Sequence, residues 1–357
     1  MIARIVSAEY SRSLPKPIVT SHGEYQNRAG IILAIWDDEG RVGLGEAAPL
    51  PGFSRESLED VARSLASIQS APPRSVEALM AMAAEHVKVP SLQFALECAA
   101  LDLEAQARDI TLAAVLAHEP LSSVQVNGLI GDGETSEMAR RATELWAAEY
   151  MTFKVKVAAG DPARDLARIN AITRAAPQAH LRLDANGGWD RDTAELVMSA
   201  IPIEHIEFLE QPFPVGLADS AKKLCAAHGV RLALDEEIDS ISAGETIVSA
   251  RGCDVIVLKP MILGSVLACH RLATTAVAQG MTAIYTSSWE SDIGLGATLH
   301  LPAALGQEGL SMGLSTAGMI ADGIIDRPLR IENARLLVPE RSGLGLRLSS
   351  EFLSRLA

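Results

Sequence analysis

Aromatic residues and cysteines are scarce in this chain. Aromatic residues make up 4% of the 357 residues, and only four cysteines are present, at positions 98, 225, 253 and 269. Ala, Leu, Ile and Val must therefore fill most of the core. The cysteines are widely spread and form no CxxC pair. We expect reduced thiols, mostly buried, in a cytoplasmic protein.

Long apolar runs, an excess of positive charge and a Gly-rich phosphate loop are also missing. The run from Ile31 to Trp36 is far too short to span a bilayer. The net charge of −14 disfavours nucleic acid and anionic membrane surfaces as partners. We therefore expect a small-molecule partner. An anionic one is compatible with this charge, because local lysines and a metal can outweigh the overall field. The oligomeric state is left open.

The composition supports a large core divided between two domains. Hydrophobic residues make up 48% of the chain and charged residues 21%. Residues 1–50 are β-rich and contain a hairpin turn pattern at Asp37–Gly40, whereas residues 54–118 are helix-like. We predict an α+β domain over residues 1–118, completed by a C-terminal segment from about 325 to 357.

From Val124 onward, short apolar runs alternate with helix-like segments. Such alternation predicts parallel βαβ units, and seven or eight units in this length suit a (β/α) barrel over residues 119–324. A doubly wound open sheet is the main alternative, but no Gly-rich loop follows any run. Asp192–Glu195 resembles a capping box that begins one of the helices. The six clearest runs are 151–157, 180–183, 205–209, 230–234, 254–258 and 282–285.

Charged residues recur in phase with these runs. Lys156, Asp184, Glu210, Asp235 and Lys259 stand at the ends of five runs, at intervals of 28, 26, 25 and 24 residues. Each interval is close to one βα unit, and the carboxyl ends of parallel strands share one rim of a barrel. A lone acid at a strand end is more often a helix cap or a salt-bridge partner. The shared phase of all five positions favours a site.

The residue types indicate the chemistry of that site. Lys154 and Lys156 are two apart on one strand, so both side chains can point into the barrel. Asp184, Glu210 and Asp235 would converge from three successive strands, and they are unlikely all to stay ionised without a cation. Ligands that are all oxygen favour Mg²⁺, or Mn²⁺, over zinc.

These motifs resemble those of the enolase superfamily, in its muconate-lactonizing subgroup. The resemblance covers nearly the whole chain and implies a modified (β/α)7β TIM-like barrel with an α+β capping domain. It also implies a lysine base and Mg²⁺ acting on a carboxylate substrate. The motifs that carry it are Lys154–Lys156, Asp184-Ala-Asn186, Glu210-Gln-Pro212, Asp235-Glu236 and Lys259-Pro260.

Two further segments are similar to o-succinylbenzoate synthases: residues 45–54 and residues 286–294. The similarity implies a carbon–oxygen lyase of menaquinone biosynthesis. Such an enzyme dehydrates 2-succinyl-6-hydroxy-2,4-cyclohexadiene-1-carboxylate to 2-succinylbenzoate. One departure is that Ala158 stands where the family usually has Gly after the Lys-x-Lys-Val motif.

The resemblance also implies a role for each residue. Lys156 would take the proton alpha to the carboxylate, and Lys259 would stabilise the enediolate from the other face. Lys154 would keep Lys156 unprotonated by like-charge repulsion. Asp184, Glu210 and Asp235 would hold the metal, with Asn186 and Glu236 supporting them.

Substrate selection is expected to involve lid loops at 14–28 and around Phe53. Ser287, Ser288 and Glu290 at the barrel rim are further candidates, although ordinary loop or capping chemistry also explains them. Three activities share the same machinery and remain open: N-succinylamino-acid racemase, dipeptide epimerase and muconate cycloisomerase. A catalytically idle barrel is the alternative from another class. The intact set of lysines and carboxylates argues against it.

Overall fold

A computed structural model describes the whole chain except residues 21–22, 86, 159, 321–322 and 357. The N-terminal part begins with an antiparallel sheet in the order β1-β2-β3, in which β2 pairs with both neighbours. The expected turn at residues 37–40 joins β2 to β3. The expected lid loop at 14–28 falls on the hairpin of β1 and β2, whose tip at 21–22 lies outside the described residues. The strands are β1 (Ile2–Thr20), β2 (Gly23–Asp37) and β3 (Val42–Ala47).

The second half of strand β2 is buried on both faces. Ile31, Leu33 and Ile35 pack in a cluster with the helices that follow the sheet, whereas Ile32 and Ala34 pack in the cluster that fills the barrel. Successive side chains of a strand point to opposite faces, so one strand contributes to two cores. The helices are α1 (Leu58–Ser70), α2 (Val76–Glu85), α3 (Pro90–Ala107) and α4 (Leu112–Leu116).

Two glycines let the sheet lie directly on α3. A Cβ atom added at Gly45 would stand 1.9 Å from the carbonyl oxygen of Ala95, and one at Gly43 would stand 2.1 Å from that of Ala99. No side chain fits at such distances, so β3 and α3 are in backbone contact there. This contact fixes the sheet and its following loop relative to the helical layer.

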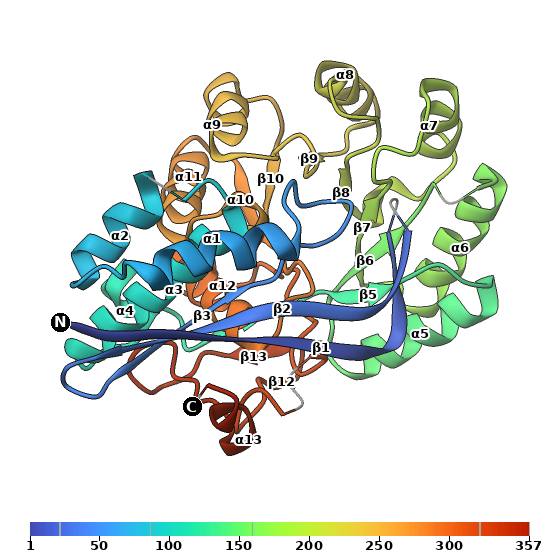
Figure 1. Cartoon of the computed structure of the whole chain (residues 1–357). Coiled ribbons are helices and arrows are strands. Elements are labelled where there is room, and N and C mark those ends of the chain that lie inside the picture. Colours follow the sequence, from blue (N-terminus) through green and yellow to red (C-terminus); the bar gives the residue numbers. More distant parts are fainter. Residues whose placement is uncertain (21–22, 86, 159, 321–322, 357) are drawn as a thin grey trace.

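The second part is a barrel of parallel strands surrounded by helices (Figure 1). Seven strands follow one another in chain order, and each pairs with the next in parallel register. They are β5 (Gly128–Ile130), β6 (Thr152–Lys156), β7 (His180–Asp184), β8 (Ile206–Glu210), β9 (Leu232–Leu234), β10 (Val255–Leu258) and β11 (Thr282–Tyr285).

The sheet curls until its two edges approach, and a very short segment joins them. Met312 bridges Val126 and Gly313 bridges Thr286, both in parallel sense. The Met312 nitrogen donates to the Gln125 carbonyl at 2.7 Å, and the Gly313 nitrogen donates to the Tyr285 carbonyl at 2.8 Å. This segment takes the place of an eighth strand, so the predicted fold class is confirmed.

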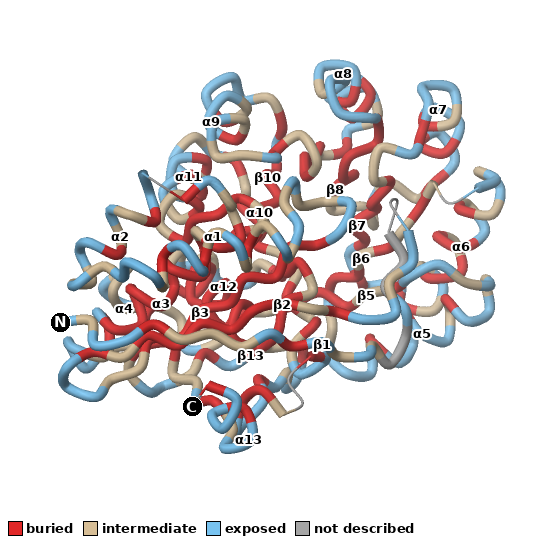
Figure 2. The backbone as a smooth tube through the Cα atoms, in the orientation of Figure 1, coloured by how far each residue is buried: buried red, intermediate tan, exposed pale blue. Residues whose placement is uncertain are grey.

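Most of the barrel helices cover the strands with one buried and one exposed face, whereas α12 is buried on all sides (Figure 2). The α7 helix begins earlier than predicted: Asp190, not Asp192, is the N-cap, and its carboxylate accepts from the Thr193 nitrogen at 2.8 Å. The helices are α5 (Thr135–Ala147), α6 (Pro162–Ala175), α7 (Arg191–Met198), α8 (Ala218–His228), α9 (Ile241–Ala250), α10 (Pro260–Leu263), α11 (Val266–Ala278) and α12 (Asp292–Leu305), with a 3-10 turn at Ile203–His205.

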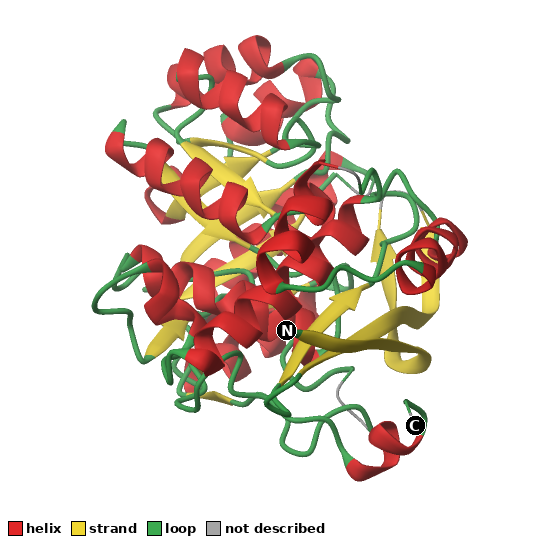
Figure 3. Ribbon diagram, turned by 60° about the vertical axis from the view of Figure 1, so that its left-hand side comes forward, coloured by secondary structure: helices red, strands yellow, loops and turns green. Residues whose placement is uncertain are grey.

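The C-terminal segment packs beside the N-terminal part, as Figure 3 shows near the end marked C. It pairs with the chain just before the barrel through β13 and β4, and its helix α13 buries Phe352. Dividing the chain into residues 1–118 plus 325–357 and residues 119–324 remains our proposal. The elements are β4 (Ser123–Gln125), β12 (Ile331–Glu332), β13 (Arg335–Leu337) and α13 (Ser350–Ser354).

His300 of α12 joins these parts. Its Nδ1 atom accepts from the Ala113 nitrogen at 3.2 Å, and its Nε2 atom lies 3.3 Å from the Leu344 carbonyl. The four cysteines are free and buried. Among the described residues, no helix combines the length and apolar character that crossing a membrane requires.

Candidate active site

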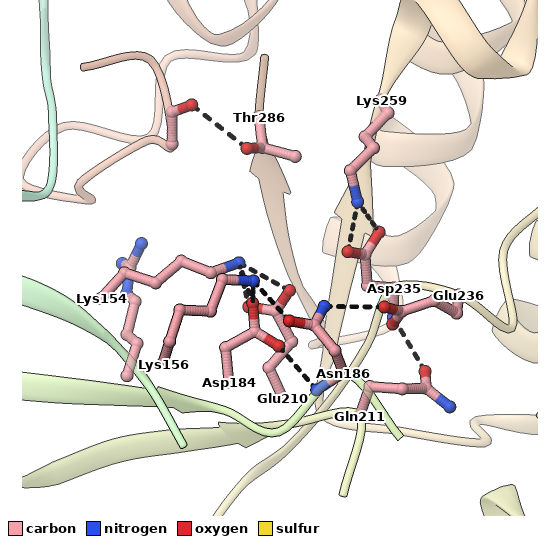
Figure 4. A network of polar contacts seen from close by, with 12 residues as sticks. Lys154, Lys156, Asp184, Asn186, Glu210, Gln211, Asp235, Glu236, Lys259 and Thr286 are labelled. Carbon is pink, nitrogen blue, oxygen red and sulfur yellow. Dashed lines mark hydrogen bonds and ion pairs between the residues drawn. The ribbon is translucent and has the colours of Figure 1, made fainter. Parts of the chain in front are cut away.

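The predicted charged residues meet at the carboxyl-terminal rim of the barrel. Lys156, Asp184 and Glu210 are the last residues of β6, β7 and β8, and Lys259 directly follows β10. The register pairs Lys156 with Asp184 and Asp184 with Glu210. Figure 4 shows the lysines of β6 on one side of the carboxylates and Lys259 on another.

The ammonium groups of β6 contact the buried carboxylates directly. Lys154 Nζ donates to the two Glu210 oxygens at 2.7 and 2.8 Å and lies 2.9 Å from Asp184 Oδ2. Lys156 Nζ donates to Asp184 Oδ2 at 2.6 Å and to Asn186 Oδ1 at 2.5 Å. Two lysines on the same face of one strand therefore share the Asp184 carboxylate.

Lys259 forms the other side of the site. Its Nζ atom donates to both oxygens of Asp235, and it stands 5.6 Å from the centre of the Phe53 ring. Burial opposes the charged form of Lys259, but Asp235 and Glu236 outweigh it and raise the pKa of this ammonium. Phe53 thus brings an aromatic face from the N-terminal part over a barrel cation.

The electrostatics of the carboxylates depend on which cation each one contacts. Burial and the neighbouring Asp184 raise the pKa of Glu210 to about 8, against the opposing effect of Lys154. Burial would also raise the pKa of Asp184, but Lys154 and Lys156 lower it below its ordinary value. Three acids packed this closely need positive charge to be ionised together.

Asn186 and Glu236 are hydrogen-bonded to each other beside this cluster. Asn186 Nδ2 donates to Glu236 Oε1 at 2.8 Å, and the Asn186 nitrogen donates to Asp184 Oδ1 at 3.0 Å. Asn186 has a positive φ of 43°, which an Asn tolerates better than most residues. It therefore links Lys156, Asp184 and Glu236 through one side chain and its backbone.

A cavity of about 370 Å³ opens on the side of Asp235 and Lys259, whereas Lys154, Lys156, Asp184 and Glu210 are not among the residues that line it. That volume suits a small molecule. The sequence did not predict Asp239 or the apolar residues of the barrel loops in this wall, because loops between strands and helices have no periodic pattern. The lining includes the predicted residues Phe53, Asn186, Asp235, Glu236 and Lys259, together with Gln211, Pro214, Val215, Ile238, Asp239 and Ile262.

Three predicted substrate contacts lie in the loop after β11, buried within the protein. Ser287 Oγ accepts from Thr316 Oγ1 at 2.8 Å, and Glu290 accepts from the Ser288 nitrogen. Their polar groups are thus partly occupied within the protein. A role in substrate binding remains a prediction for Ser287, Ser288 and Glu290.

The chemistry of the donors fits a hard divalent cation, whereas their present positions do not form a finished site. Asp184, Glu210 and Asp235 are 0%, 1% and 6% exposed and offer only oxygen. Among the described residues, however, no three His, Cys, Asp or Glu side chains stand close enough to hold an ion as they are. The lysine ammonium groups already contact these carboxylates. A metal held there would compete with these ammonium groups for the carboxylate oxygens.

Comparison with known proteins agrees with this architecture. Residues 137–352 match the family described as enolase C-terminal domain-like, and residues 6–103 match the family described as MenC, N-terminal domain. The chain belongs to the enolase superfamily. Its N-terminal part is of the MenC type.

The similar proteins include more than one activity. The chain is 29% identical to an o-succinylbenzoate synthase of Pectobacterium atrosepticum, covering 89% of this chain and 91% of that one. It is 28% identical to the chloromuconate cycloisomerase CbnB of Cupriavidus necator, covering 73% and 71% of the two chains.

Solved structures share the fold along the whole length. The muconate lactonizing enzyme of Pseudomonas fluorescens, complexed with muconolactone, has a TM-score of 0.88 at 22% identity and covers 99% of this chain and 98% of that one. A dipeptide epimerase of Methylococcus capsulatus, complexed with Mg and the dipeptide L-Arg-D-Lys, has a TM-score of 0.86 at 27% identity and covers 97% and 99%.

Proposed function

We propose that this chain is an o-succinylbenzoate synthase, a cytoplasmic lyase of menaquinone biosynthesis. It would convert 2-succinyl-6-hydroxy-2,4-cyclohexadiene-1-carboxylate to 2-succinylbenzoate by syn elimination of water. The observation that carries the proposal is the MenC-type N-terminal part placed over a barrel rim with two opposed lysines. The o-succinylbenzoate synthase relatives, matched over most of their length, support it.

Asp184, Glu210 and Asp235 are the proposed ligands of Mg²⁺, with Mn²⁺ as a substitute. The ion, when bound, would neutralise these carboxylates, hold the ring carboxylate of the substrate and stabilise the second negative charge of the enediolate. The Mg-containing dipeptide epimerase of similar fold supports this assignment. Asn186 would keep Asp184 in place, and Glu236, which bonds Asn186, would support Asp235.

Lys156 is the proposed base and acid of the elimination. Its Nζ atom would take the proton alpha to the carboxylate, and the electrons of that C–H bond would delocalise onto the carboxylate. Lys156 would then return the proton to the departing hydroxide on the same face, so that water leaves and the ring becomes aromatic. Lys154, held between Glu210 and Asp184, would supply fixed positive charge beside it.

Lys259 would stabilise the enediolate from the opposite face, and Phe53 would pack against that lysine and the substrate ring. The second lysine also supports an alternative activity. A racemase or epimerase needs a proton-transfer group on each face, and Lys259 would be the group on the second face. The cycloisomerase relatives keep lactone formation open as well.

The test is the loss of cyclohexadiene absorbance with purified, Mg²⁺-loaded protein and with Lys156→Ala. We expect wild-type turnover and a loss of at least about 100-fold in the variant. An exposed lysine variant, Lys223→Ala, serves as the matched control. No turnover by wild type would contradict the proposed activity.

A second measurement separates the alternatives. Incubating the protein with an N-succinyl amino acid, and separately with a dipeptide, in deuterated water tests for exchange of the alpha proton. Rapid exchange without dehydration would assign a racemase or epimerase. Absence of turnover, exchange and Mg²⁺ binding together would identify an idle barrel.

A further inference from the structure

Arg28 is a buried cation that the proposed reaction does not use. It lies on β2 and is only 3% exposed. Every N–H group of its guanidinium donates to a backbone carbonyl. The acceptors are Trp289 at 2.9 Å for Nε, Ala29 at 2.9 Å and Pro49 at 2.8 Å for Nη1, and Ala48 and Ser288, the latter at 3.3 Å, for Nη2.

Two of these acceptors belong to residues 48–54, which we call the cap loop. The loop closes on itself, because the nitrogens of Phe53 and Ser54 donate to the Leu50 carbonyl at 3.0 and 2.8 Å. Holding Ala48 and Pro49 therefore also holds the turn that presents Phe53 to Lys259. Phe53 and Gly52 line the substrate-sized cavity.

Two other acceptors belong to residues 287–291, which we call the rim loop. Trp289 there has a φ of +62°, a conformation that costs energy for a bulky side chain and persists only when its surroundings enforce it. Ser288 is 1% exposed, and its Oγ atom has no hydrogen-bond partner among the described residues. The Arg28 bonds to the two carbonyls help to enforce this loop conformation.

The surroundings explain why a cation is tolerated in this position. Glu290 is 2% exposed, and burial, more than the nearby Glu46, raises the pKa of its carboxyl to about 7, while the positive charge of Arg28 acts in the opposite direction. Glu46 itself bridges the two parts: its carboxylate accepts from Ser291 nitrogen at 2.8 Å and from Gly294 nitrogen at 2.8 Å. Arg28 therefore stands at a junction between the sheet and the rim, where backbone carbonyls surround its guanidinium and a buried acid lies within range of its charge.

We propose that Arg28 is a positioning residue that fixes the cap loop and the rim loop against each other, and thereby sets the shape of the substrate pocket. A planar group with five donors bonds both loops at once, which a lysine with three donors cannot reproduce. The assignment rests on the proposed function only in treating this pocket as the substrate site.

Hydrogen exchange tests the positioning without any substrate. In Arg28→Lys and Arg28→Met, we expect amides of residues 50–54 and 287–291 to exchange at least about tenfold faster, the change expected when stabilising hydrogen bonds are lost. The matched control is Arg182→Lys, another buried arginine. Its guanidinium bonds the Glu207 carboxylate at 2.8 and 2.9 Å and the Ser311 carbonyl at 2.6 Å, inside the barrel.

Kinetics with the cyclohexadiene substrate supply the second readout. We expect KM to rise about tenfold in Arg28→Lys, with kcat within about threefold of wild type, because the reacting lysines and carboxylates are untouched. Exchange that stays at the wild-type level in both loops, or that rises equally throughout the chain, would overturn the proposal. Faster loop exchange in a protein that turns over nothing would uphold Arg28 and reject only the proposed reaction.

Discussion

The barrel rim and the N-terminal cap contribute differently to the same pocket. The rim supplies charge: three lysines and three buried carboxylates gather at or near the ends of successive strands, and Asp235 and Lys259 among them line the pocket. The cap supplies shape: one aromatic ring, a self-closing loop and a buried arginine bonded to carbonyls. Residues placed on rigid strands and residues placed on loops can change independently, which suits a fold found in cycloisomerases, dipeptide epimerases and o-succinylbenzoate synthases.

Removing the metal should have the largest effect on activity, because the charged residues of the rim act together with it. Chelation is expected to lower turnover at least about 1,000-fold, because charge stabilisation at the reacting carboxylate is lost. Saturating Mg²⁺ at about 100 times its Kd should also stabilise the fold by about 2.7 kcal/mol. Calorimetric melting with and without chelator measures this in the absence of substrate. The Asp184→Asn variant should have the same melting temperature with and without chelator. If the wild-type protein also shows no difference in melting temperature, the assignment of the metal ligands is contradicted.

Lys259 is the next largest contribution from the rim. Lys259→Met should lower kcat by about 100-fold, comparable to the loss of one preorganised electrostatic group at a reacting centre. Steady-state kinetics at saturating Mg²⁺ measures it, with the exposed Lys223→Met as control. If the variant dehydrates normally but no longer racemises an N-succinyl amino acid, Lys259 serves only as a second proton-transfer group.

The rim was predictable from the sequence, whereas most of the cap contribution was not. Lys156, Asp184, Glu210, Asp235 and Lys259 recur at the spacing of a βα unit, and parallel strands necessarily bring their ends to one rim. No comparable rule relates Arg28 to its partners. Its acceptors are backbone carbonyls, which every residue has, in loops up to 261 positions away along the chain.

Two local features, the start of α7 and the segment that closes the barrel, were also hard to predict from the sequence. Asp190 and Asp192 both precede helix-like residues, and the helix begins after the first of them. A tertiary bond from the Trp189 nitrogen to the Pro212 carbonyl at 3.1 Å holds the chain just before that cap. The segment that closes the barrel is too short to show a strand pattern, since only Met312 and Gly313 form its bridges.

The titration of His300 tests how the contact between the N-terminal part and the barrel contributes to stability, and it does not involve the pocket. Burial lowers the pKa of His300 from 6.5 to about 4 in the folded protein. The unfolded chain therefore binds a proton first, and stability present above pH 6.5 is lost as pH falls toward 4. The loss attributable to this group is about 3 kcal/mol. Urea unfolding of wild type and His300→Gln between pH 7 and 4 should show the wild type losing more by this amount. Parallel curves would contradict it.

Substitutions of Phe53 test how strongly the cap influences substrate binding at the rim. Phe53→Ala should raise KM about tenfold with little change in kcat, which corresponds to a cation–π and packing contribution of about 1.4 kcal/mol. Phe53→Leu keeps most of the apolar volume and should recover only part of the loss. Equal behaviour of Leu and Phe would assign the effect to packing alone. A fall in kcat would place the ring at the reacting centre.

The smallest effect is expected at an ion pair that joins the cap to Asp239 of the barrel, a residue that lines the pocket. Arg55 Nη2 contacts Asp239 Oδ2, and the side chains are 66% and 53% exposed. Exposed pairs of this kind contribute about 0.5 kcal/mol, and 1 M salt screens them within about 3 Å. A double-mutant cycle of Arg55→Ala and Asp239→Ala on KM should give a coupling near this value that vanishes in 1 M salt. A coupling that is several times larger and insensitive to salt would mean that the cap holds the pocket closed by charge as well as by shape, and the division between the two regions would no longer hold.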